Sequence, residues 1–219
     1  MRSMLPSFTR LTFRIVAALA LGLFAAPVDA AGPVRILAFG DSVTAGLGLA
    51  ESDTLPSRLA DALIKMGRPA IVINGGVSGD TTADGLARID WALADKPQIM
   101  ILALGANDML RGLDPGAARA NLEKIIEKAE AAHVETILAG MLAPPNLGTE
   151  YKNAFDAIYP GLAKAHNLLF MPFLLQDVAQ ISDLNQADGL HPNGNGVAVM
   201  VRNLLPYVTQ AMDKLGKAS

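Results

Sequence analysis

The sequence has 219 residues, no cysteine and a formal net charge of −3, and 51% of its residues are hydrophobic. The absence of cysteine excludes disulfides, and a mildly acidic chain without a basic cluster lacks the electrostatic footprint of a protein that binds nucleic acid or anionic membranes. About 200 residues suit one domain that buries an ample core.

The first thirty residues have the order of a secretory signal peptide. A start with three arginines is followed by twelve apolar or small residues, 15–26, and residues 27–30 then offer the small side chains that a signal peptidase accepts. Twelve helical residues cover only about 18 Å, less than the ~30 Å hydrocarbon core of a bilayer, which disfavours a retained anchor. We therefore expect a signal peptide over 1–30, a single domain over 31–219 and a periplasmic or secreted protein with no stable membrane anchor. The mature chain would carry 15 basic and 20 acidic residues, a net charge of −5.

The first half of the mature chain alternates uninterrupted apolar runs with segments of helical periodicity. In chain order they predict a strand, a helix, a strand, a helix and a strand over 34–39, 55–66, 70–73, 81–94 and 98–104.

The second half continues the alternation. It predicts a helix, a strand, a helix and a strand over 115–132, 135–140, 150–165 and 168–171. A last helix carries Val197 to Leu205, and we expect Pro206 to end or kink it, because proline lacks the N–H donor and clashes with the preceding turn.

Strands that are apolar throughout are buried on both faces. Such strands alternating with helices predict an α/β fold, a three-layer α/β/α sandwich around a central, mostly parallel five-stranded sheet. Ligands in this class of sheet bind beyond the carboxyl ends of the strands. The segments in which to search for a site are therefore 40–48, 75–81, 105–112 and 141–150.

Ser42 lies just past the first predicted strand, where a serine hydroxyl is exposed at a turn and can act as a nucleophile. It needs a base, and the chain has three histidines. His133 and His166 each end a predicted helix, a common site for a cation. His191 lies instead in a loop of glycine and proline before the last helix, so it is the candidate base.

Asp188 lies three residues before His191. A carboxylate there can bond one imidazole nitrogen, fix the tautomer of the ring and stabilise the imidazolium. Aspartate before glycine is also common in turns, so the pair carries weight only together with Ser42.

The sequence does not match several other catalytic and ligand-binding motifs. No serine has the Gly-x-Ser-x-Gly context, and the glycines fit neither a phosphate loop nor a dinucleotide fingerprint. A calcium loop beginning at Asp183 fails at its later positions, and without cysteine or a paired-histidine helix zinc is unsupported. We expect no metal and no cofactor.

Four separated blocks of the chain, residues 39–42 (Phe-Gly-Asp-Ser), 78–81 (Ser-Gly-Asp-Thr), 105–108 (Gly-Ala-Asn-Asp) and 188–192 (Asp-Gly-Leu-His-Pro), resemble the SGNH (GDSL-type) hydrolase family in its order. Segments 85–88 and 157–160 are similar to the bacterial thioesterase I, lysophospholipase and arylesterase branch. Val43 replaces the leucine of the namesake motif, and Ala106 replaces a frequent glycine. The resemblance implies the flavodoxin-like SGNH hydrolase fold.

The resemblance also implies residue roles. Ser42 would be the nucleophile, His191 the base that later protonates the leaving group, and Asp188 the residue that orients the histidine. The oxyanion hole would combine the backbone N–H groups of Ser42 and Gly79 with the side-chain amide of Asn107. Acyl transfer needs such donors independently, since each is worth roughly 3–4 kcal/mol in the transition state.

Three aspartates of these blocks stay outside the catalytic set. We expect their carboxylates to accept backbone hydrogen bonds and to hold three adjoining turns in shape; they are Asp41, Asp80 and Asp108.

The substrate is less defined. Apolar residues on the loops nearest the predicted site, including Leu110, Leu142 and Pro144, either bind an acyl group or pack the loop bases. We expect a small-molecule acyl ester or thioester, such as an aryl ester or a lysophospholipid, and no nucleic acid.

A carbohydrate O-deacetylase or an acyltransferase has the same core. A non-catalytic binding protein would be expected to have lost a site residue, and a nucleotide-binding domain lacks its phosphate motif. The sequence predicts no oligomeric state.

Overall fold

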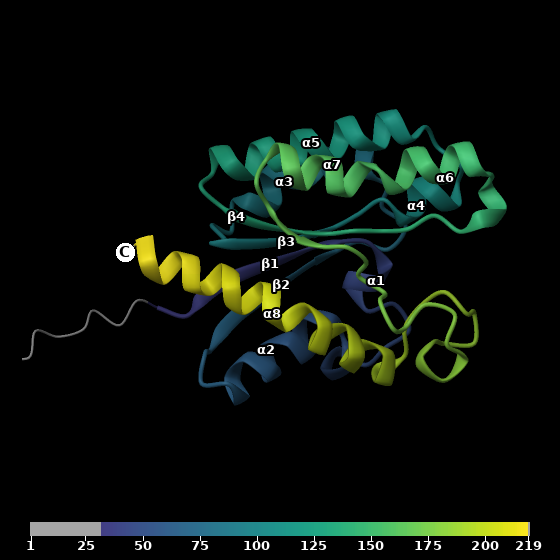
Figure 1. Ribbon diagram of the computed structural model, residues 1–219. Helices are drawn as coiled ribbons and strands as arrows, with labels where there is room; N and C mark the ends of the chain where they lie inside the picture. The colour runs from purple at the N-terminus through teal and green to yellow at the C-terminus, as the bar shows by residue number, and fades with distance from the viewer. Residues whose placement is uncertain (1–31, 219) are drawn as a thin grey trace, which may run out of the picture. The chain divides into compact units, whose positions relative to one another are not determined.

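The computed structural model of the protein describes residues 32–218 (Figure 1). The predicted signal peptide over 1–30 lies outside the described residues. Within the described range, no helix is long and apolar enough to cross a membrane.

A parallel sheet of five strands forms the centre of the fold. Its strands are β1 (Val34–Gly40), β2 (Ala70–Gly76), β3 (Ile99–Ala103), β4 (Glu135–Ala139) and β5 (Leu169–Met171). Their order across the sheet is β2-β1-β3-β4-β5, and every pairing is parallel. The predicted strands and the parallel sheet are confirmed.

Helices cover both faces of this sheet (Figure 1). One face carries α2 (Leu55–Lys65) and α8 (Gly194–Ala218). The other carries α3 (Thr82–Leu93), α5 (Pro115–Ala131), α6 (Thr149–Asp156) and α7 (Ile158–Ala165). Short helices occupy the loops: α1 (Ser42–Ala45), α4 (Ala106–Leu110), η1 (Glu51–Asp53), η2 (Pro145–Leu147) and η3 (Ser182–Leu184). The three-layer α/β/α prediction is confirmed.

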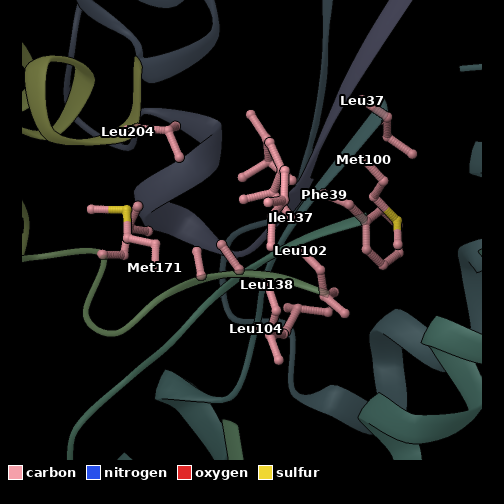
Figure 2. Close-up of a cluster of buried hydrophobic side chains, with 14 of the residues drawn as sticks. Leu37, Phe39, Met100, Leu102, Leu104, Ile137, Leu138, Met171 and Leu204 are labelled. Carbon is pink, nitrogen blue, oxygen red and sulfur yellow. The ribbon is translucent and has the colours of Figure 1, made fainter. Parts of the chain in front are cut away.

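The core lies where the middle strands meet these helices. Figure 2 shows Phe39 of β1 near Met100 of β3, with Ile137 and Leu138 of β4 beside Leu102, and all of these side chains are buried. Burial of apolar area contributes about 25 cal/mol per Å². The strands that end at the candidate site are thus held by the most deeply buried part of the molecule.

The predicted helix over 150–165 is two helices that meet at Ala157. Pro160 explains the break, since its ring displaces the carbonyl of residue i−4, which is Asp156, the last residue of α6. In the first turn of α7 the missing N–H of Pro160 costs little.

Pro206 does not end the last helix, which was one of the two outcomes expected there. The helix α8 continues from Gly194 to Ala218 with Pro206 inside it. Pro206 and Arg202, whose carbonyl loses its partner, are both exposed, so water can satisfy that carbonyl. The buried face with Leu204 and Val208 keeps the helix on the sheet across the proline.

Candidate active site

The candidate site forms at the carboxyl ends of β1, β2 and β3. The chain runs from β1 to β2 on one side and then crosses to β3 on the other, so neighbouring loops diverge at this point of the sheet. Ser42 follows β1, Gly79 follows β2 and Asn107 follows β3. These three residues line one cavity of about 320 Å³ together with His191.

Ser42 is held at the start of α1 by a tight turn. The Asp41 carboxylate accepts the N–H of Val43 at 3.0 Å and caps the helix. A Cβ at Gly40 would lie 2.1 Å from the Thr44 hydroxyl and 2.7 Å from the Ala103 carbonyl, so only glycine fits there. At a helix start the N–H groups lack intrahelical partners, which leaves that of Ser42 free to serve a ligand.

A hydrogen-bonded chain joins Ser42 to His191 and Asp188. The Ser42 Oγ lies 2.9 Å from His191 Nε2, and His191 Nδ1 lies 2.6 Å from Asp188 Oδ2. Since a carboxylate can only accept, Nδ1 carries the proton and Nε2 is left to accept from the serine hydroxyl. The imidazole thus has the tautomer of a general base.

Asp188 is both a turn residue and the partner of the histidine. Its Oδ1 accepts the N–H groups of Leu190 at 2.9 Å and His191 at 3.0 Å. The backbone N–H of His191, followed by its ring and the N–H of Leu190, lowers the pKa of Asp188 to about 2. The carboxylate therefore stays ionised at neutral and mildly acidic pH.

Gln186 joins the loop that carries His191 to the loop that follows Ser42, a link that the sequence did not indicate. Its side-chain amide donates to the carbonyls of Leu47 at 2.8 Å and Pro192 at 3.0 Å. Its backbone N–H donates to the His191 carbonyl at 2.7 Å. A polar residue in a loop carries no sequence signal for such long-range bonds, so only the fold reveals this role.

Asn107 and Gly79 face the cavity from the loops after β3 and β2. The Asn107 amide donates to the Asp80 carbonyl at 2.9 Å, which leaves the second amide hydrogen for a ligand. Gly79 has φ +88°, a conformation that glycine adopts without strain, and the Arg111 guanidinium donates to its carbonyl at 2.8 Å. The backbone N–H groups of Ser42 and Gly79 and the second amide hydrogen of Asn107 can converge on one anionic oxygen.

The walls of the cavity are mostly apolar. Large side chains lining it are Val43, Leu47, Met109, Leu110, Leu175 and Leu190. Among the described residues, the lining includes the expected Leu110 but neither Leu142 nor Pro144. Both follow β4, which lies one strand further from β1 than β3 does.

Asp41 is a buried acid directly beside the serine. Its side chain is 1% exposed, and within the described residues its Oδ2 has no hydrogen-bond partner. Burial raises the pKa of Asp41 to about 6, against the opposing effect of the Val43 N–H and the nearby His191.

The two other aspartates hold loops in different ways. Asp108 accepts the N–H of Thr82 at 2.8 Å and its hydroxyl at 2.6 Å, as the sequence led us to expect. Asp80 differs, because its carboxylate binds the guanidinium of Arg88 at 2.5 Å. In residues 32–218, no cluster of three or more histidine or acidic side chains could hold a metal ion.

Fold and site together define a class of protein. A serine, a histidine and an aspartate bonded in series, beside an apolar cavity at the switch point of a parallel sheet, form the arrangement of a hydrolase that acts on ester bonds. The model of the GDSL-like lipase/acylhydrolase family matches residues 38–199, and the chain belongs to this family.

Curated and solved relatives agree with this assignment. An arylesterase from Vibrio mimicus is 39% identical over 159 residues, which are 72% of this chain and 80% of the relative. Thioesterase 1/protease 1/lysophospholipase L1 from Escherichia coli (strain K12) is 35% identical over 186 residues, 84% of each chain. AlinE4, an SGNH-hydrolase family esterase of known crystal structure, has 46% sequence identity to this chain and superposes with a TM-score of 0.70. The match covers 83% of this chain and 97% of the AlinE4 chain. The predicted family, fold and class of enzyme are confirmed.

Proposed function

We propose that the protein is a secreted esterase that hydrolyses small carboxylic esters and acyl thioesters through an acyl-Ser42 intermediate. The observation that carries the proposal is the chain from Ser42 through His191 to Asp188, which opens on a cavity that Gly79 and Asn107 also line. The proposal needs no cofactor, because these side chains supply the nucleophile, the base and the oxyanion donors.

The reaction has two acyl-transfer steps. His191 Nε2 takes the hydroxyl proton while Ser42 Oγ bonds to the acyl carbon, and the negative charge moves to the carbonyl oxygen. The donors of Ser42, Gly79 and Asn107 stabilise that charge. Collapse of the tetrahedral species breaks the bond to the alcohol or thiol, which leaves with the proton from His191. Water then attacks the acyl-Ser42 ester by the same route and releases the acid.

The cavity supports substrates with small or medium acyl groups. A volume of about 320 Å³ lies at the lower end of the range for ligand pockets. Its leucine, methionine and valine side chains favour methylene groups, each worth about 0.8 kcal/mol when buried. The names of the relatives, an arylesterase and a thioesterase/lysophospholipase, fit this class. An apolar lining offers few partners for sugar hydroxyls, which disfavours the carbohydrate deacetylase alternative.

The proposal includes export to the periplasm or beyond. The first thirty residues support it, because a start with three arginines is followed by an apolar run and then by small residues. Expression with the full leader should give a protein whose N-terminal sequence begins at Ala31. Recovery of the intact N-terminus from the exported fraction would contradict cleavage.

Hydrolysis of a series of p-nitrophenyl esters and acyl thioesters tests the activity. The wild-type protein should hydrolyse both classes, with kcat/KM rising as the acyl chain fills the cavity and falling beyond it. Ser42→Ala should abolish hydrolysis. Ser78→Ala is a matched control, since Ser78 lines the same cavity but is not bonded to His191. Robust turnover by Ser42→Ala would refute the acyl-Ser42 route.

A further inference from the structure

Arg88 joins the end of β1 to the loop after β2. It lies on α3, where its Nε binds the Asp80 carboxylate at 2.5 Å and its Nη2 donates to the Gly40 carbonyl at 2.9 Å. The guanidinium also lies 4.1 Å above the ring of Phe39. One planar side chain therefore has partners on two separate segments of the candidate site.

The pair of Arg88 and Asp80 is the most buried ion pair among those found in residues 32–218. The two side chains are 19% and 11% exposed, whereas the other arginine and lysine pairs have partners between 24% and 73% exposed. Removing two charges from water offsets much of their attraction, so a pair of this kind adds little net stability. What it does supply is geometry, because the rigid fork of arginine can hold a carboxylate and a carbonyl at once.

Both partners of Arg88 adjoin the proposed oxyanion donors. Gly40 lies two residues before Ser42, and Asp80 directly follows Gly79. The backbone carbonyl of Asp80 accepts the amide of Asn107. The three segments that carry the donors therefore meet at the Arg88–Asp80 pair.

We propose that Arg88 is a positioning residue that sets the spacing of the three oxyanion donors. The inference rests on the proposed function, since it assigns the donors to Ser42, Gly79 and Asn107. Donors act on the transition state only when they lie about 2.7–3.1 Å from the developing oxyanion. A misplacement of about 1 Å can cost about 10²-fold in rate, even when the change lies away from the reacting atoms.

The test compares Arg88→Met with Arg88→Lys and a control. Arg119→Met makes the same substitution at a half-exposed arginine of α5 that pairs with Glu123, away from the cavity. Active sites in each sample are counted by end-point titration with a fluorophosphonate, so that unfolded protein does not enter the rate. Steady-state kinetics on a p-nitrophenyl ester then give kcat and KM, and a boronic acid that forms a tetrahedral anion on serine reports on the oxyanion donors.

Arg88→Met should lower kcat per active site about 10- to 100-fold with little change in KM, and should weaken boronic acid inhibition by a similar factor. Arg88→Lys should give an intermediate loss, because one ammonium cannot hold both Asp80 and the Gly40 carbonyl in the same plane. Arg119→Met should match the wild type.

A purely structural role would appear as a lower Tm with unchanged kcat per site and unchanged boronic acid inhibition, and that result would overturn the proposal. If Arg88→Met does not fold, Arg88→Lys decides, because wild-type kinetics in that variant contradict the need for the fork. Failure of the proposed function has a separate signature, esterase activity that survives in Ser42→Ala, and it would overturn this inference as well.

Discussion

The side-chain amide of Asn107 should act on the transition state and not on the bound substrate. The Asp80 carbonyl holds one amide hydrogen at an N···O distance of 2.9 Å, which fixes the direction of the other toward the cavity. Asn107→Ala removes that donor and leaves the backbone of α4 in place. The loss of one pre-oriented donor costs about 3–4 kcal/mol, so kcat should fall roughly 10²- to 10³-fold while KM changes little.

Asn107→Asp sharpens the same experiment. The carboxylate has nearly the shape of the amide, but it repels both the Asp80 carbonyl and a developing oxyanion, so kcat should fall at least as far as in Asn107→Ala. Asn203→Ala is the control, because the Asn203 amide makes a comparable bond, 3.0 Å to the Gln176 carbonyl, away from the cavity. Initial rates over a range of p-nitrophenyl ester concentrations separate kcat from KM. A change confined to KM, or a loss in kcat equal to that of Asn203→Ala, would refute the oxyanion role.

Three further predictions concern the base, the buried acid and the cavity. Asp188→Asn replaces one accepting oxygen by an NH2 group that can only donate, so the side chain cannot accept both His191 Nδ1–H and the backbone N–H groups of its own turn. The kcat should fall about 10³- to 10⁴-fold with an unchanged circular dichroism spectrum; wild-type rates would contradict the triad. Burial raises the pKa of Asp41 from 3.8 to about 6, so the folded state holds a proton that the unfolded state releases. This contribution is fully present only below pH 3.8 and is lost as pH rises through 6. Urea unfolding at about pH 4 and pH 7 should therefore show a drop of about 2 kcal/mol that Asp41→Asn lacks. A parallel pH dependence in that variant would be the contrary result. Met109→Trp should shift the ester preference toward shorter acyl chains, since it fills part of the 320 Å³ cavity; an unchanged chain-length profile would place the acyl group elsewhere.

The sequence predicted the layers because the strands are apolar runs and the helices have clear periodicity. A run such as that of β3 is buried on both faces, and only a sheet covered by helices on both sides can accommodate it. The placement of Ser42 follows from the same pattern, because it comes directly after β1. His191 could be selected because the other two histidines end helices. The structure places His133 after α5 and His166 after α7.

Features that depend on tertiary contacts could not be predicted from the sequence. The helical turn α1 is too short to show a periodicity, and the close packing that admits only glycine at position 40 is visible only in the fold. Leu175 of the cavity wall lies in an irregular segment after β5, where no repeat marks it. The contact of Arg88 with Gly40 joins residues 48 positions apart, and the helical pattern of α3 shows only a charged residue there.

The central claim is that Ser42 is the nucleophile. Treatment with a fluorophosphonate, digestion with trypsin and mass spectrometry should find the phosphonyl group on the peptide 36–58, with fragment ions that place it on Ser42 rather than on Ser52 or Ser57. Ser42→Ala should take up no label, and Ser78→Ala should be labelled like the wild type. A label on any other residue, or stoichiometric labelling of Ser42→Ala, would contradict the account.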